Sequence, residues 1–478
     1  MPLTDFQAIL PHIILAAGAI VIMLMAAAKR THSGSLGLAV ITLGAALVSL
    51  FSVSQIVPQD VTVLLKMDQF TIFYSALVLV AGLVVTLISY PYFQGFKDNC
   101  EEYYILLLLS VLGGLVLVSS THFISLFLGL EVMTLALYGM VGYMRKEPKA
   151  LEAATKYFVL ASATSAFLLY GMALIYFETG SMAFSDIGTA MAELDQITSI
   201  LIIGFGMLVV AVGFKLSVFP FHLWTPDVYH GAPAPVAAFL GTVSKGAMLA
   251  IFLRFFIEID VYAFDTVMAT LSVVAIASML VGNLLALLQT NIKRLLAYSS
   301  ITHMGYMFVA LIAGQQIGAE GVTFYLLAYV MTTLAGFSIV GMLSTHQQEA
   351  EEIVHYKGLF WRKPWMAASL TVVLLSLAGI PLTAGFLGKY YIMAAGVNTD
   401  LWGLLAIVVV ASVIGLFYYL RVVVTMISQE EVTESIPSPR FNFGNGLALA
   451  IVTLLIVYNG IYPTMAIDFI QTAVGSLY

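Results

Sequence analysis

Long apolar runs separated by short polar segments follow one another along the whole chain. A membrane core of about 30 Å needs roughly 20 apolar residues per helix. Such runs predict fourteen helices, over residues 7–28, 35–57, 70–91, 103–120, 122–143, 155–177, 199–222, 236–257, 264–288, 294–314, 321–344, 364–396, 401–427 and 446–466. The first run follows an acidic start and has full spanning length, so we expect no cleavable signal. The pattern predicts an all-α polytopic membrane protein.

The composition agrees with this prediction and narrows the function. Of the 478 residues, 61% are hydrophobic and 9% are charged, and the mean hydropathy is +1.00. Soluble domains carry roughly 25% charged residues. The net charge is -7, and the lysines and arginines form no basic stripe along the sequence, so we expect no nucleic-acid binding. With Cys100 as its single cysteine, the chain offers neither a disulfide framework nor a Cys-ligated cluster or structural zinc site, and any redox chemistry belongs elsewhere.

The cations indicate how the helices cross the membrane. Loops after odd-numbered helices are predicted to hold thirteen of the nineteen lysines and arginines, whereas loops after even-numbered helices hold only Lys66 and Arg254. By the positive-inside rule, the odd-numbered loops face the cytoplasm. With fourteen crossings, both termini would lie on the outer, periplasmic side of a bacterial inner membrane.

Four ionisable residues fall near the middle of predicted helices: Glu131, Lys215, Lys245 and Lys389. At a rise of 1.5 Å per residue, each lies about 14 to 17 Å from the nearer helix end. A charge at that depth costs at least about 2.5 to 3.5 kcal/mol, and such residues usually mark ion or proton pathways. Structural ion pairs are the alternative, although one carboxylate cannot pair three lysines. Lys156 lies nearer the cytoplasmic mouth, as either a relay residue or an interfacial anchor.

Two prolines interrupt apolar runs beside a lysine. Pro220 follows Lys215 by five residues, and Pro381 precedes Lys389 by eight. Proline removes a helical hydrogen bond, and membranes tolerate this where other helices, side chains or water satisfy the freed carbonyl. Residues 364–396 would span about 50 Å as one straight helix. We therefore expect helices seven and twelve to be broken near their prolines.

The two broken helices occupy corresponding places in a weak internal repeat. The segment from Lys156 resembles that from Thr323, and the segment from Ser119 resembles that from Leu288, at offsets of 167 and 169 residues. Helices four to eight would recur as nine to thirteen, inverted because five is odd; inverted repeats with discontinuous helices are typical of secondary transporters. This predicts four segments: three helices in 1–100, the first five-helix repeat in 101–258, the inverted repeat in 259–428, and helix fourteen in 429–478.

Histidines supply further candidates for proton transfer. His303 lies within helix ten beside three hydroxyl groups, those of Ser299, Ser300 and Thr302. Because imidazole titrates near neutrality, it is a relay candidate. His222 and His230 flank "TPDVYHGAPAPV" on the cytoplasmic side, where each is either an interfacial hydrogen-bonding group or a relay. Within that segment, Thr225 is predicted to cap a short helical turn that begins at Pro226.

Together, these motifs resemble a known family. They are a glutamate in helix five, "GFKLSVFPFHLWTPDVYHGAPAPV", "SK" in helix eight, "NIKRLLAYSSITHMGY" and "AGIPLTAGFLGKYY". Over nearly the whole chain they are similar to the antiporter-like subunits of proton-pumping NADH:quinone oxidoreductase, respiratory complex I. The helix-twelve lysine and the amino-acid sequence of the helix-seven motif favour the subunit N family over the other antiporter-like subunits of the complex. His230 departs from the glutamate or glutamine expected at its position.

The resemblance implies a translocase subunit that carries protons and holds no redox centre, cofactor or metal. NADH, FMN, iron–sulfur clusters and quinone would lie on other subunits, and the partners would be neighbouring antiporter-like and small membrane subunits. In the family, the positions matching Glu131 and Lys215 form an ion pair, Lys245 links inward, and Lys389 leads to the outer exit. The alternatives are a subunit of a multi-subunit cation/proton antiporter and an inert scaffold. Sodium sites favour carboxylate and carbonyl oxygens, so three lysines favour protons.

Overall fold

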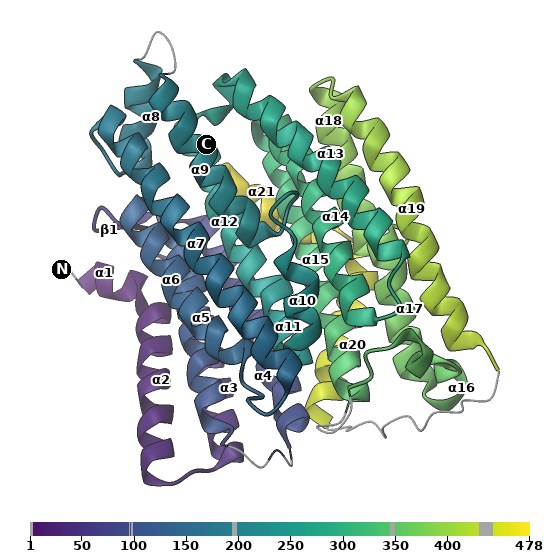
Figure 1. Ribbon diagram of the computed structural model, residues 1–478. Helices are drawn as coiled ribbons and strands as arrows, with labels where there is room; N and C mark the ends of the chain where they lie inside the picture. The colour runs from purple at the N-terminus through teal and green to yellow at the C-terminus, as the bar shows by residue number, and fades with distance from the viewer. Residues whose placement is uncertain (1–2, 95, 97–98, 194–197, 345–348, 430–442) are drawn as a thin grey trace.

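A bundle of helices forms the computed structural model, which describes residues 3–94, 96, 99–193, 198–344, 349–429 and 443–478 (Figure 1). In these ranges thirteen helices are long and apolar enough to cross a membrane. Two shorter segments, α17 (Pro364–Ala378) and α18 (Ala384–Asn398), divide the run predicted as one further crossing. The prediction of an all-α polytopic membrane protein with about fourteen spans is confirmed.

The elements follow the predicted order. The N-terminal part contains α1 (Leu3–Ala8), α2 (Leu10–Ala28), α3 (His32–Val53), β1 (Gln59–Val61), β2 (Leu65–Met67) and α4 (Gln69–Phe93). The next part contains α5 (Glu101–Ser119), α6 (Phe123–Val141), α7 (Pro148–Thr179), α8 (Phe184–Ala192), α9 (Ser199–Leu216), α10 (Trp224–Gly231), α11 (Ala234–Phe239), the π-helical turn η1 (Leu240–Ser244) and α12 (Lys245–Ile259).

The remaining elements complete the bundle. Before the two shorter segments come the 3-10 turn η2 (Val261–Ala263), α13 (Asp265–Leu287), α14 (Ile292–Ala313), α15 (Gln315–Leu343), the 3-10 turn η3 (Ile353–Tyr356) and α16 (Leu359–Arg362). After them come α19 (Trp402–Ile427), α20 (Phe443–Ile461) and α21 (Thr464–Gly475). The apolar pattern did not predict the antiparallel β1–β2 hairpin, α8 or α21, because these elements are too short to span a membrane.

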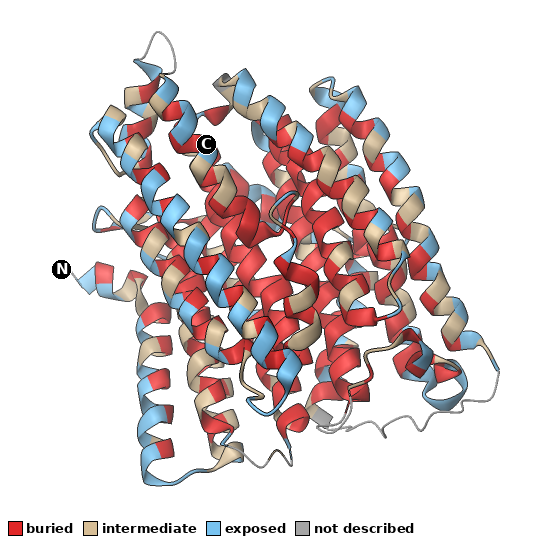
Figure 2. Cartoon of the chain, viewed as in Figure 1, coloured by how far each residue is buried: buried red, intermediate tan, exposed pale blue. Residues whose placement is uncertain are grey.

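Burial separates central helices from peripheral ones. The run from α11 to α12 is buried except at Ile257 and Glu258, and α14 and α15 are almost entirely buried, whereas α7 is the least buried of the candidate spans within the described residues. Figure 2 shows the buried residues concentrated in the middle of the bundle. Side chains on the central helices therefore contact protein instead of lipid, which is where a polar group can find a partner.

The break in helix seven lies around Pro220, as predicted, but the first segment ends before the predicted residue 222. The first segment, α9, ends at Leu216, and Ser217 has a positive φ of 61°. The left-handed backbone of Ser217 ends the helix there, as is common at helix C-termini. The predicted cap at Thr225 is also wrong, since the N-cap is Leu223 and α10 begins at Trp224, two residues before the predicted start at Pro226.

The break in helix twelve lies where the sequence predicted it. The first segment ends at Ala378, Gly379 adopts φ +84°, and α18 starts at Ala384. The neighbouring α20 packs directly against this break. A Cβ added to Gly460 would lie 2.5 Å from the backbone of Leu382 and Thr383, so the two main chains are in close contact.

Two cations assigned to loops lie buried inside helices. Arg254 is in α12, where its guanidinium donates to both Asp68 oxygens at 2.8 and 2.9 Å and to Thr71 Oγ1 at 2.9 Å. Lys293 is in α14, where it donates to Ala232 O at 2.8 Å and pairs with Glu349. The assignment of these two residues to loops is therefore wrong. The sequence did not show this, because the partners that stabilise each buried charge lie far away in the sequence.

Candidate functional site

Lys215 lies in the last turn of α9, buried between α6 and α7. Its Nζ donates to Thr134 Oγ1 at 2.7 Å and lies 5.4 Å from the centre of the Tyr157 ring. The free carbonyl groups at a helix C-terminus carry partial negative charge and stabilise a cation. A hydroxyl, an aromatic face and a helix end therefore hold this lysine.

Glu131 lies one turn before Thr134 on the same face of α6 and is partly exposed. Its Oε1 accepts a hydrogen bond of 2.5 Å from Ser165 of α7. Among the described residues, no ion pair within 4.0 Å joins Glu131 to Lys215. In this structure the two charges are separated, and Thr134 occupies the position next to the lysine.

Lys245 is fully buried and follows the π-helical turn η1. Its Nζ donates to Ser300 Oγ of α14 at 2.7 Å and lies 5.8 Å from the centre of the Tyr229 ring of α10. Turns of this kind occur frequently at functional sites. The sequence predicted a continuous helix here and gave no sign of the π turn.

His303 lies one turn after Ser300 on α14 and is surrounded by tyrosines. Its Nδ1 is 2.6 Å from the Tyr325 hydroxyl, and its Nε2 is 3.0 Å from the Tyr419 hydroxyl. Tyr419 also contacts the hydroxyl of Ser299. Both ring nitrogens therefore have a partner that can donate or accept a proton.

Lys389 binds the end of the broken helix that precedes it. Its Nζ donates to Ala378 O, the last residue of α17, at 2.9 Å and lies 4.9 Å from the centre of the Tyr306 ring. Tyr306 also packs edge-on against His303, with ring centres 5.7 Å apart. The carbonyl freed by the helix break is thus the hydrogen-bond acceptor for the lysine.

These contacts join into one row across the bundle. From Lys215 the contacts pass through the rings of Tyr157, Trp224 and Tyr229, whose centres lie 5.0 and 6.4 Å apart, to Lys245. From Lys245 the row continues to Ser300, one turn along α14 to His303, and through the Tyr306 ring to Lys389. The structure therefore connects the three buried lysines that the sequence singled out, with Glu131 one helical turn from the start.

A single methyl group near the break should disturb Lys389. A Cβ on Gly379 would lie 2.8 Å from Lys389 Cδ, and the positive φ costs an L-residue about 1–2 kcal/mol. We expect Gly379→Ala to displace the ammonium from Ala378 O and to reduce proton uptake by inverted membrane vesicles per electron transferred. The matched control, Gly403→Ala, adds a Cβ with no atom within 4 Å. Equal uptake in both variants would show that Lys389 need not hold this position.

The remaining candidates lie outside the row. Lys156 is partly exposed and pairs with Asp227 at 2.7 Å and Glu152 at 2.6 Å, which suits an interfacial anchor. His222 is buried against the ring of Phe219 with its Nδ1 unbonded. Within the described ranges, no group of three or more His, Cys, Asp or Glu side chains is arranged to hold a metal ion.

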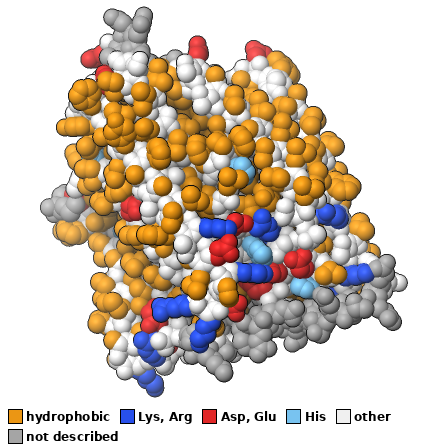
Figure 3. Space-filling view, in the orientation of Figure 1, with side chains coloured by type: hydrophobic (Ala, Val, Ile, Leu, Met, Phe, Trp, Pro, Cys, Tyr) orange, Lys and Arg blue, Asp and Glu red, His pale blue; other side chains and the backbone are white. Residues whose placement is uncertain are grey.

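Charged side chains gather in the lower part of the face shown in Figure 3, below a broad apolar belt. His230 Nε2 lies 3.0 Å from Glu351 Oε2, and Lys149 donates to Glu351 Oε1 at 2.9 Å. Burial alone raises the pKa of Glu351, but the hydrogen bonds from His230 and Lys149 lower it from 4.5 to about 2. The stabilisation from this carboxylate is therefore present above pH 4.5 and is lost only as the pH falls toward 2.

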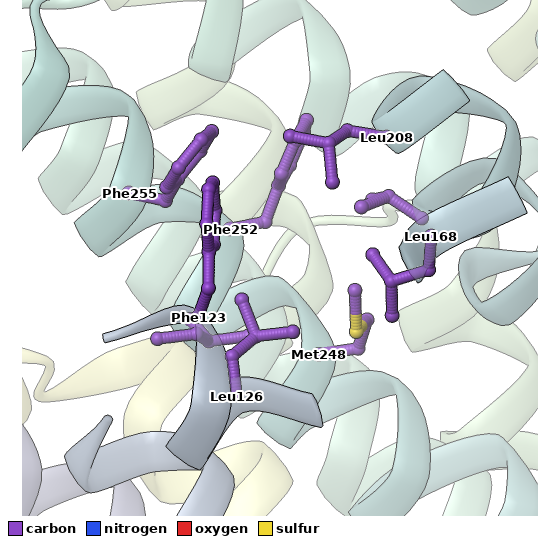
Figure 4. Close-up of a pocket in the computed structure, with 9 residues that line it drawn as sticks. Phe123, Leu126, Leu168, Leu208, Met248, Phe252 and Phe255 are labelled. Atoms are coloured by element: carbon purple, nitrogen blue, oxygen red, sulfur yellow. The ribbon is translucent and has the colours of Figure 1, made fainter. Parts of the chain in front are cut away.

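An apolar pocket lies between helices of the first half of the chain (Figure 4). The residues that line it come from α6, α7, α9 and α12 and are Phe123, Leu126, Leu168, Leu208, Val212, Met248, Ile251, Phe252 and Phe255. No polar side chain lines this pocket. Two of these residues, Val212 and Met248, stand one helical turn from Lys215 and Lys245, and cavities with such a lining stay dry. The pocket therefore provides no hydrated route away from the lysines.

Residues 120–415 match the family described as NADH:quinone oxidoreductase/Mrp antiporter, TM. The chain is 47% identical over 477 residues to NADH-quinone oxidoreductase subunit N of Ectopseudomonas mendocina (strain ymp), with 98% of this chain and 96% of that protein covered. It is also similar to a chain of respiratory complex I from Thermus thermophilus with bound Aureothin: TM-score 0.83, 30% identity, 96% of this chain and 98% of that chain covered. A chain of the Mrp complex from Dietzia sp. DQ12-45-1b has a TM-score of 0.88 at 19% identity, with 100% and 98% covered, and shares the fold.

Proposed function

This chain belongs to the NADH:quinone oxidoreductase/Mrp antiporter transmembrane family, and from this premise we propose that it is a proton-translocating, antiporter-like subunit of NADH:quinone oxidoreductase. Its partners are the other membrane-arm subunits, which with the soluble part of the complex hold the flavin, the iron–sulfur clusters and the quinone site. It lies in a bacterial inner membrane with both termini on the periplasmic side. The 47% identity to a subunit N supports this proposal.

The partners of the buried cations carry the proposal. Arg254 and Lys293, which are 0% exposed, each pair with a carboxylate, as structural cations do. Lys215, Lys245 and Lys389 are 3%, 0% and 6% exposed, yet their acceptors are a hydroxyl, a hydroxyl and a carbonyl. A buried cation without a counter-charge is costly, so these three lysines are suited to losing and regaining a proton.

Proton transfer would begin at Glu131 and Lys215. A nearby carboxylate favours the charged form of a lysine and burial disfavours it, so movement of Glu131 toward or away from Lys215 would load and unload the proton. The proton would then pass to Lys245, His303 and Lys389. Each charge moved against the membrane potential costs about 2.3 kcal/mol per 100 mV.

The hydroxyls without partners support a hydrated path along this row. The Tyr157 hydroxyl is buried without a hydrogen-bond partner among the described residues, and the Tyr229 and Tyr329 hydroxyls make no well-formed hydrogen bond there, although Ser300 lies near both. Buried polar groups ordinarily bond to protein or water, so water would bridge these positions. Because the pocket between α6, α7, α9 and α12 is apolar, we place the exit beyond Lys389.

The two helix breaks support the inverted repeats over residues 101–258 and 259–428. In the first half a lysine occupies the C-terminal turn of α9, and in the second half Lys389 binds the C-terminal residue of α17. Each half thus places an ammonium group at the negative end of a broken helix.

The test is a pair of neutral replacements in the intact complex. We expect Lys215→Met and Glu131→Gln to lower proton pumping at least about tenfold, because an unsupported midplane charge costs at least about 2.5 kcal/mol and each 1.4 kcal/mol slows a step tenfold. Lys29→Met, at an exposed loop lysine, is the control. Proton uptake by inverted vesicles and NADH oxidation are measured together. Normal pumping in both variants refutes the proposal, and sodium-dependent transport by reconstituted protein would favour a cation/proton antiporter.

A further inference from the structure

The short helix α10 is attached to both halves of the bundle through Asp227. One oxygen accepts from Lys156 of α7 at 2.7 Å, and the other accepts from Arg294 of α14 at 2.8 Å. α7 belongs to the first predicted repeat and α14 to the second. One carboxylate thus joins three helices that are distant in the sequence.

A second attachment lies one turn further along α10. His230 contacts Glu351, in the segment after α15, and Glu351 also binds Lys149 of α7. Both attachments link α10 to the first half and to the second half. We call this set the cross-half clamp; it consists of Lys149, Lys156, Asp227, His230, Arg294 and Glu351.

The opposite side of α10 faces the buried lysines. Trp224 donates through Nε1 to Phe214 O at 2.9 Å and packs against Tyr157, whose ring lies over Lys215. Tyr229 places its ring 5.8 Å from the ammonium of Lys245. Moving α10 would therefore move the groups that lie between these two lysines.

The backbone on either side leaves α10 dependent on such contacts. The helix has 8 residues. Before it, residues 217–223 are not α-helical, and after it Pro233 limits continuation into α11. A helix of two turns has little stability of its own, so its tertiary contacts fix its position.

We propose that the cross-half clamp sets the position of α10, and that Asp227 is thereby a positioning residue for proton transfer between Lys215 and Lys245. The role of Asp227 in proton transfer rests on the proposed function, whereas the effect of the clamp on the position of α10 does not. Asp227 touches neither lysine and acts through the rings of Trp224 and Tyr229. The clamp residues are partly exposed, so each ion pair adds little to overall stability.

The test compares Asp227→Asn with Glu152→Gln in the whole complex. Both changes remove a carboxylate that binds Lys156, but only the first removes an attachment of α10. We expect Asp227→Asn to give several-fold faster amide hydrogen exchange in the α10 peptide and fewer protons pumped per NADH oxidised. Glu152→Gln should leave both values at those of the parent complex, and Asp227→Glu should restore them in part.

The outcomes test separately whether the clamp positions α10 and whether Asp227 is a positioning residue for proton transfer. Unchanged exchange in α10 overturns the clamp, and faster exchange with unchanged pumping overturns the positioning role. The exchange result does not depend on whether Lys215 carries protons, so failure of the proposed function would appear only in the lysine variants. If Asp227→Asn does not assemble, Arg294→Gln, which removes one of the two partners of Asp227, receives the same measurements.

Discussion

Replacing Asp68 with alanine should lower the free energy of unfolding by about 3–5 kcal/mol, the usual cost of breaking a buried ion pair from one side. Arg254 is fully buried, and after the change its only remaining carboxylate among the described residues is Glu258 at 3.5 Å. The substitution also removes the acceptor of the Thr71 amide at the start of α4, at 2.8 Å. The loss would be large beside the roughly 5–15 kcal/mol that stabilises a typical domain.

The measurement is unfolding of the purified complex in detergent. Asp60→Ala, at an exposed position of the β1–β2 hairpin, is the control. The double variant Asp68→Asn, Arg254→Met should recover most of the stability, because the main cost arises from the uncompensated charge. If Asp68→Ala lies within about 1 kcal/mol of the parent, the pair behaves as an exposed one and the prediction is wrong.

Gly460→Ala should cause the second large effect, by pushing α20 away from the break in helix twelve. The new Cβ would meet the backbone of Leu382 and Thr383 at 2.5 Å, and backbone cannot yield as a side chain can. We expect a cost at or above the upper end of the about 1–3 kcal/mol typical of overpacking. Proton pumping should fall as well, because Lys389 is held by the same break.

Thermal unfolding of the complex and pumping per NADH oxidised test this expectation. Gly475→Ala is the matched control, since its Cβ meets no atom within 4 Å. Parental pumping and stability in Gly460→Ala would mean that the break does not depend on its contact with α20.

The sequence predicted the spans well and their interruptions unevenly. Apolar runs located the helices because lipid imposes a minimum length on each. In helix twelve, the excess length and the Gly379–Pro381 segment identified the break. In helix seven, Pro220 showed only that a break was near, and the positive φ of Ser217 had no sequence signal. The π turn before Lys245 likewise depends on packing that no local pattern records.

The site was predicted by depth, and its chemistry required the structure. Burial of Lys215, Lys245 and Lys389 followed from their distance to the loops. Their partners could not be predicted, because Thr134 lies 81 residues before Lys215, and Ser300 lies 55 residues after Lys245. Threonines, serines and tyrosines are common in such helices, so nothing marked these ones in advance.

Partners that are distant in the sequence also explain why some cations were assigned to the wrong place. Arg254 was counted with the loops because it stands near the end of its helix, and its partner Asp68 lies 186 residues away. The contact of Lys156 with Asp227, 71 residues away, could not be predicted either, and its role as relay or anchor stays a prediction. Ion pairing across the bundle is a tertiary property that helix periodicity does not report.

The contact between α20 and the break in helix twelve has a consequence for how the protein is made. Chains emerge from the ribosome N-terminus first, and α20 is the last long apolar helix of the described chain. Gly460 reaches Leu382 and Thr383 only after the preceding helices have been inserted. The second half of the molecule therefore acquires its final shape only once α20 has been inserted, so the surroundings of the Lys389 ammonium are among the last features of the described bundle to form.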